Sequence, residues 1–132
     1  YLRACLEAAT DPIAVEANRN HLRDEIGHGR IGWALLGSAW MDDGLRDALA
    51  LRLPRLLAAN VPLWLRPDPC LDDAGLPSLG HISRATMRRA IVDAVVTAIL
   101  PGFDYVGIRT EDARRRVAEL WPHAGDEAGD LR

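Results

Sequence analysis

Apolar residues recur along most of this chain at the three- and four-residue spacing of an amphipathic α-helix. The pattern is clearest between Ser83 and Leu100, where apolar pairs repeat along one side of the expected helix: Ala90/Ile91, Ala94/Val95 and Ala98/Ile99. Together with the breaker residues, this spacing predicts five helices, over residues 1–9, 12–40, 42–60, 83–100 and 111–121. We therefore expect an all-α fold.

Capping residues mark where these helices begin. Asp11 is a good N-cap, and Pro12 suits the first helical position because its missing N–H would have no intrahelical partner there. The later helices are expected to be capped in the same way by Asp42 or Asp43, Ser83 and Thr110.

Prolines mark where the helices bend or end. Pro54 lies inside the third expected helix, where it removes a backbone hydrogen bond and clashes with the preceding turn, so we expect a kink or two short helices. The sequence Asn60-Val61-Pro62 predicts the end of that helix, and Pro101-Gly102 predicts the end of the fourth. Residues 66–82 contain three prolines and two glycines and are expected to form an irregular crossing loop, and residues 122–132 a disordered tail.

The length and net charge of the chain limit the kinds of protein that it can be. A chain of 132 residues fits one domain, and a net charge of −3 leaves no positive field that would attract nucleic acid or an anionic membrane surface. The sequence has no run of about 18 uninterrupted apolar residues, so we expect no transmembrane helix and a cytoplasmic location. Cys5 and Cys70 lie far apart, which favours buried or free thiols over a disulfide.

Two residues of the helix expected over 12–40 have the spacing of metal ligands. At about 100° per residue, Glu25 and His28 lie about 60° apart on a helix, so their carboxylate and imidazole can reach one point. His21 and Gly32 fall on the same stripe, which has apolar residues on either side of it: Leu22, Ile26, Trp33, Leu35 and Leu36. A polar line with apolar edges is typical of a surface that faces the interior of a helical bundle.

The same helix contains four glycines, Gly27, Gly29, Gly32 and Gly37. Each costs about 1 kcal/mol relative to alanine in a helix interior, so we expect packing or a bound metal to offset them. Small residues at these positions permit the close approach of another helix.

Other readings of these residues remain open. Glu25 and His28 can be a surface hydrogen-bonded pair, or His28 a satisfied core histidine. The spacing His-x-x-x-Glu-x-x-His differs from the His-Glu-x-x-His of zinc proteases, and no glycine-rich phosphate loop or serine nucleophile elbow is present. The four tryptophans are expected to be core or helix-junction anchors: Trp33, Trp40, Trp64 and Trp121. The remaining histidines, His81 and His123, are expected to be solvated.

Asp24-Glu25-x-x-His28 followed by Trp33, in a long helix entered through Asp11-Pro12, resembles the fourth bundle helix of ferritin-like di-iron proteins. The similarity is to bacterial ferritin-like domain proteins related to rubrerythrin and to the carboxylate-bridged di-iron oxygenases. It covers residues 1 to about 40, and residues 83–121 resemble the C-terminal helices of some members more weakly.

This resemblance implies a ferritin-like helical bundle, with residues 1–65 as its C-terminal part and residues 83–121 as additional helices of the same domain. It implies a di-iron centre, or one with manganese, in which Glu25 bridges or chelates the metal and His28 binds one ion. Asp24 would accept the ring N–H of a ligating histidine from another helix, and His21 would lie beside the site.

The chain departs from the family pattern in two ways. Gly27 stands where the oxygenase motif commonly has arginine, and only one Glu-x-x-His is present. The turn at Thr10-Asp11-Pro12 folds the first helix back along the second, which places Glu7 near Val15, about 15 Å from the motif along the axis. We therefore expect the missing ligands, and the N-terminal helices that carry them, upstream of Tyr1.

Two functions from different classes follow. The first is a metal-dependent oxidoreductase that uses O₂ or peroxide with an unidentified redox partner. The second is a non-catalytic helical scaffold that uses its third and fourth helices for oligomerisation or partner docking. A homodimer that pools two half-motifs is a further possibility.

Overall fold

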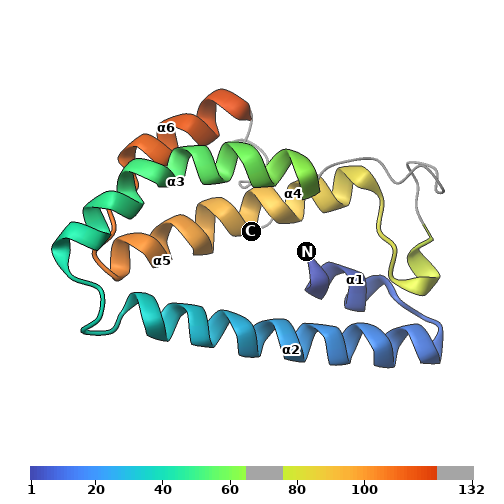
Figure 1. Cartoon of the computed structure of the whole chain (residues 1–132). Coiled ribbons are helices and arrows are strands. Elements are labelled where there is room, and N and C mark those ends of the chain that lie inside the picture. The colour runs from blue at the N-terminus through green and yellow to red at the C-terminus, as the bar shows by residue number, and fades with distance from the viewer. Residues whose placement is uncertain (65–75, 122–132) are drawn as a thin grey trace. The chain divides into compact units, whose positions relative to one another are not determined.

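The computed structural model describes residues 1–64, without the side chain of Trp64, and residues 76–121, and contains no β-strand in these ranges (Figure 1). In chain order the elements are α1 (Leu2–Ala8), α2 (Pro12–Leu36), α3 (Asp43–Trp64), a short 3₁₀ helix η1 (Pro77–Leu79), α4 (Arg84–Ala94), a π-helix η2 (Val95–Ile99), α5 (Leu100–Tyr105) and α6 (Glu111–Leu120). The predicted all-α class is confirmed. None of the helices in the described part is long and apolar enough to cross a bilayer.

The chain divides into two compact units. One contains Tyr1–Ala34 and the described part of Leu65–Ala90, and the other contains Leu35–Trp64 and the described part of Ile91–Arg132. The predicted division at residues 65, 82 and 121 stays a prediction.

In the first unit, η1 holds the turn between α1 and α2. The backbone N–H groups of Thr10 and Asp11 both donate to the carbonyl of Ser78, at 2.9 and 3.0 Å. Asp11 caps α2 as predicted, because its Oδ1 accepts from the N–H groups of Ile13 and Ala14.

Gly80 closes this junction in a conformation that favours glycine, with φ of +80°. A Cβ there would lie 2.5 Å from Asn18 Nδ2 and 2.9 Å from the carbonyl oxygen of Cys5. The close packing of these three segments therefore depends on a residue without a side chain.

In the second unit, α3 and α6 lie side by side (Figure 1). The buried apolar residues of this unit come from α3, the end of α4, η2 to α6 and the turns beside them: Met41, Leu53, Leu57, Val61, Ile91, Val92, Val95, Leu100, Ile108, Ala113, Val117 and Trp121. Burial of this apolar surface supplies the main force that holds the unit together.

The helix end predicted at Asn60-Val61-Pro62 is wrong, because α3 continues through it to Trp64. α3 also continues through Pro54, so two short helices do not form there, and the alternative of a kink stays a prediction. Val61 is completely buried, so packing holds this last stretch in helical form although Pro62 donates no hydrogen bond. Asn60 donates back to the carbonyl of Leu56 at 2.8 Å and adds a contact within the helix.

Pro101-Gly102 does not end the fourth helix either, because α5 runs through it to Tyr105. The proline ring would clash with the carbonyl four residues earlier in a regular α-helix. Here a π-helix precedes it, in which the N–H of Leu100 donates five residues back to Val95. We attribute the continuous helix to this wider turn, since it changes the carbonyl geometry directly before the proline.

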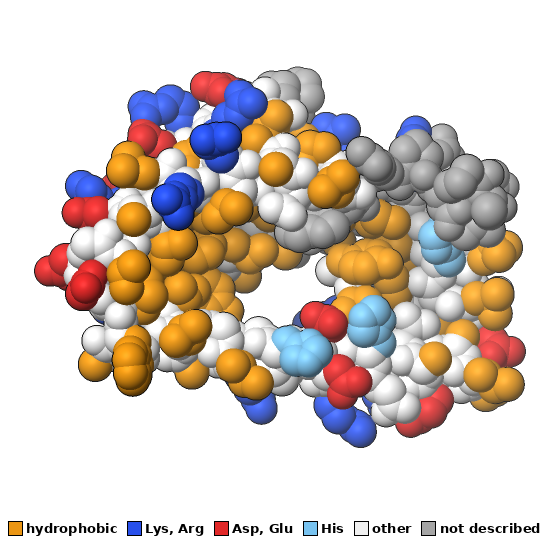
Figure 2. Space-filling model, viewed as in Figure 1, with side chains coloured by type: hydrophobic (Ala, Val, Ile, Leu, Met, Phe, Trp, Pro, Cys, Tyr) orange, Lys and Arg blue, Asp and Glu red, His pale blue; other side chains and the backbone are white. Residues whose placement is uncertain are grey.

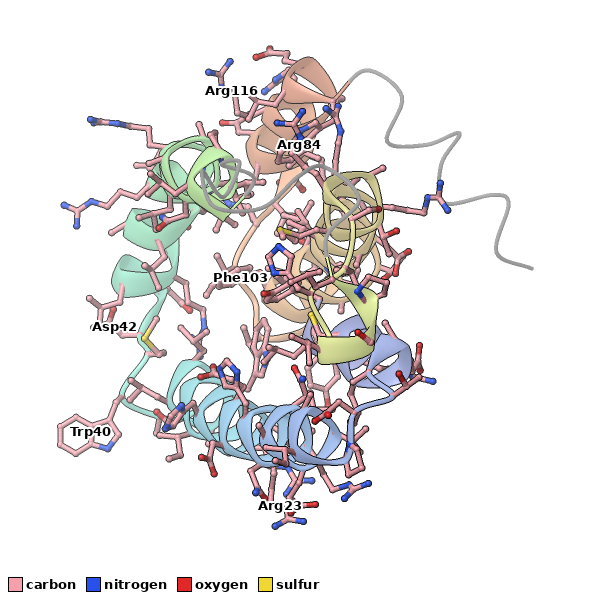
Figure 3. The ribbon with its side chains drawn as sticks, turned by 90° about the vertical axis from the view of Figure 1, so that its right-hand side faces the viewer. Arg23, Trp40, Asp42, Arg84, Phe103 and Arg116 are labelled. Carbon is pink, nitrogen blue, oxygen red and sulfur yellow. The ribbon has the colours of Figure 1, made fainter. Side chains whose placement is uncertain are left out.

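α2 is shorter than predicted, because it ends at Leu36 and not near Trp40. Ser38 Oγ donates to the carbonyl of Leu35 at 2.7 Å, which closes the turn after the helix. Trp40 is 84% exposed and points away from the helices, so its prediction as an anchor is wrong, whereas Trp121 is buried as predicted (Figure 3).

The prediction of an irregular loop over residues 66–82 is wrong for residues 76–81 and stays a prediction for residues 66–75. Leu76 and His81 form an isolated bridge around η1, so this end of the loop is an ordered turn. Residues 66–75 of the predicted loop and the predicted tail, 122–132, lie outside the described residues.

Candidate metal site

The candidate site lies midway along α2, where histidine and acidic side chains gather on the surface (Figure 2). Glu25 Oε1 lies 3.6 Å from His28 Nδ1 and 3.8 Å from His21 Nε2. Both distances exceed those of a hydrogen bond, so the helix brings the groups together without fixing them. The predicted convergence of Glu25 and His28 on one side of a helix is thus observed, and His21 joins them.

All three side chains are accessible to water. The exposed fractions are 58% for His21, 50% for Glu25 and 72% for His28. Contacts between exposed charged groups stabilise a protein little, because water screens them. The cluster therefore contributes little to folding, and its donor atoms are open to a ligand.

The donors match the metals that the resemblance implies, but their number is incomplete. Carboxylate and imidazole together suit iron, manganese and zinc. In residues 1–64 and 76–121, no three or more histidine, cysteine, aspartate or glutamate side chains are placed to hold a metal ion. Glu25 and His28 thus match one of the two Glu-x-x-His motifs of a di-iron set, and the described residues do not supply its second motif or its two further glutamates.

Asp24 is exposed and lies about 100° around the helix from Glu25, so its carboxylate leaves α2 in another direction. Its expected contact with a ligating histidine requires a helix on that side, and it stays a prediction.

The surface around the site is open. None of the residues of α2 is buried, and a Cβ added to Gly27, Gly29 or Gly32 would meet nothing within 4 Å. Ile26 is half exposed. The polar line was expected to face a bundle interior, whereas the structure leaves it exposed.

The sequence reading missed a second polar cluster, which joins α5 to α6. The buried Thr110 hydroxyl donates to Asp104 Oδ1 at 2.7 Å and accepts from Arg114 Nε at 3.0 Å. Arg114 also donates to Asp104 Oδ2 at 2.6 Å. Thr110 precedes α6 as predicted, but its hydroxyl does not cap the helix.

Asp104 takes its ionised form readily in this cluster. Hydrogen bonds from Arg114 and then from Thr110 lower the pKa of its carboxyl group. Every polar side-chain atom that is buried in the described residues has a hydrogen-bond partner, so we interpret the cluster as structural. A contact between residues six and ten positions apart across a turn leaves no motif that would have revealed it.

Cys5 does not have the setting of a nucleophile. It is a buried thiol, as expected, and burial is the main cause that raises its pKa. Cys70 and His123 lie outside the described residues. His81 is half-buried and lies in the turn around η1, away from α2's histidines in sequence.

Comparison of the chain with models of protein families, with curated proteins and with solved structures finds no match. Its function is therefore inferred from its own residues.

Proposed function

We propose that α2 contributes half of a carboxylate and histidine metal centre, with Glu25 and His28 as ligands of iron or manganese. The observation that carries this proposal is the approach of both imidazoles to one carboxylate oxygen, at 3.6 and 3.8 Å, on an exposed helix surface. A metal at this position would gain charge-assisted contacts from side chains that have no competing role in the core.

The proposal keeps the ferritin-like bundle as the architecture in which this half-site works. A second Glu-x-x-His from a facing helix and two further carboxylates would complete the set, as in di-iron bundles. When bound, such a centre supplies O₂ or peroxide redox chemistry. Glu25 and His28 would hold the metal, and Asp24 and His21 would orient or extend the ligand set.

Metal content tests this proposal. The protein is loaded with Fe²⁺ without oxygen, dialysed and measured by elemental analysis, beside the double variant Glu25→Ala/His28→Ala. We expect the double variant to retain less than one tenth of the wild-type metal. The control variant Glu16→Ala/His81→Ala also removes one carboxylate and one imidazole, but away from the site, and should retain wild-type metal. Equal metal in the two double variants would contradict the proposal.

A scaffold without metal is the second candidate, and the exposed apolar residues favour it. Ile31 on α2 is 71% exposed and Leu51 on α3 is 74% exposed. Isolated apolar side chains are normal on a surface, whereas several on successive helices suit docking. Assembly that survives Glu25→Ala/His28→Ala, and is lost in Ile31→Ser or Leu51→Ser, would favour the scaffold over the metal site.

A further inference from the structure

We infer that the partner of the α2 half-site is a second copy of this chain, paired antiparallel along α2. This inference rests on the proposed metal-binding function. It concerns one row of residues, the α2 stripe, which consists of His21, Glu25, His28 and Gly32.

The α2 stripe has a spacing that is the same in both directions along the helix. Its members are separated by four, three and four residues. The alternation of three and four is the spacing at which helices pack along a shared seam. A twofold axis passing between Ile26 and Gly27 therefore places Glu25 opposite His28 of the second copy, and His21 opposite Gly32 of the second copy.

Both of these pairings are complementary. A carboxylate meets an imidazole, which suits either a direct ion pair or a shared metal ion. An imidazole meets a glycine, at a position where nothing lies within 4 Å of the place of a Cβ. Because a twofold axis repeats each contact, the interface contains two acid–base pairings and two large–small pairings.

Like charges stay apart in this arrangement. Arg23 and Arg30 lie about 170° around α2 from the centre of the α2 stripe, so they face away from the second copy. Arg23 points away from α2 (Figure 3). The electrostatic interaction between Glu25 of one copy and His28 of the other therefore stays attractive.

The second copy also supplies ligands that a single α2 does not carry. Residues 1–132 contain a single Glu-x-x-His, so each α2 gives one glutamate and one histidine of such a motif to the centre. Two antiparallel copies give two of each, from facing helices, with His21 of both chains at the flanks. The two α2 helices thus supply both Glu-x-x-His motifs, four of the six ligands of a set that holds two metal ions in a bundle.

Two glycine variants test the pairing without removing any ligand. Gly32→Leu places a bulky side chain on the α2 stripe, opposite His21 of the second copy. Gly27→Leu makes the same substitution on another side of α2, and also adds a Cβ into open space. Light scattering of the full chain with and without Mn²⁺ gives the mass, and loss of the free Mn²⁺ spin-resonance signal gives the metal bound.

We expect the wild type and Gly27→Leu to form dimers with Mn²⁺, and Gly32→Leu to need at least tenfold more protein to dimerise. Mixing Glu25→Ala with His28→Ala should restore part of the Mn²⁺ binding, because only the mixed dimer sets a glutamate opposite a histidine. Mn²⁺ binding by a monomer, or equal dimerisation of both glycine variants, would overturn the pairing and leave the proposed metal function standing. If the wild type bound neither Mn²⁺ nor Fe²⁺, both the pairing and the proposed metal-binding function would be contradicted.

Discussion

The strongest local prediction concerns Thr110, whose hydroxyl joins α5 to α6. Thr110→Val keeps the shape of the side chain and removes a donated hydrogen bond to Asp104 and an accepted one from Arg114. The residue is 1% exposed, so water does not replace the lost hydroxyl. Hydrogen bonds to charged groups contribute about 1.5–3 kcal/mol each. The direct Arg114–Asp104 contact survives and both partners remain over 40% exposed, so we expect a total loss of about 1.5–2.5 kcal/mol.

Urea unfolding at pH 7, followed by circular dichroism, measures this loss. Thr97→Val is the matched control, because Thr97 is exposed and its hydroxyl donates to the carbonyl of Asp93, four residues earlier in the chain. The control should change the free energy of unfolding by less than about 0.5 kcal/mol. If Thr110→Val is no more destabilising than Thr97→Val, the cluster does not hold α5 and α6 together.

The cluster of Asp104, Thr110 and Arg114 also predicts that the free energy of unfolding depends on pH. Arg114 and Thr110 lower the pKa of Asp104 in the folded chain below its unfolded value. The stability that the carboxylate contributes is therefore fully present above the ordinary aspartate pKa and is lost as the pH falls through the folded pKa. Asp104→Asn should be less stable than the wild type at pH 6–7, and the difference should shrink toward pH 3. A difference that stays constant over this range would refute the electrostatic part of the reasoning.

Two further predictions concern the first unit. Gly80→Ala should lower the free energy of unfolding by about 1–3 kcal/mol, because φ of +80° and a contact of 2.5 Å oppose a side chain. Gly27→Ala should raise it by about 0.5–1 kcal/mol, because a Cβ fits there and alanine favours the helix. Thermal unfolding of the two variants measures the difference, and equal effects would contradict it. In a Cys70→Ser background, Cys5 should react with a disulfide reagent at pH 8 at least tenfold more slowly in the native chain than in urea, since it is 3% exposed and burial raises its pKa; equal rates would show that the thiol is accessible.

The sequence predicted the features of this chain that depend on near neighbours. Asp11 caps α2, Asp42 caps α3 and Ser83 caps α4, because each side-chain oxygen accepts a hydrogen bond from a backbone N–H two or three residues ahead. The convergence of Glu25 and His28 has the same origin, because residues three apart on a helix always lie on neighbouring positions. These contacts need only the geometry of one helix, so apolar spacing and residue type were sufficient to predict them.

The tertiary structure decided what distant residues contribute. Pro62 lies inside α3 because Val61 beside it is completely buried in the second unit, a contact that local helix signals do not contain. The Thr110 hydroxyl donates to Asp104 and accepts from the Arg114 side chain, and it accepts from no backbone N–H of α6, because a turn brings these side chains together. Trp40 is exposed although its residue type favours burial, and the α2 stripe is exposed although the apolar residues beside it predicted a bundle interior. Burial depends on whether another segment covers a residue and not on the residue alone. A helix and its cap form through contacts between residues three or four positions apart. Burial and hydrogen bonds across a turn form only when different helices pack against one another.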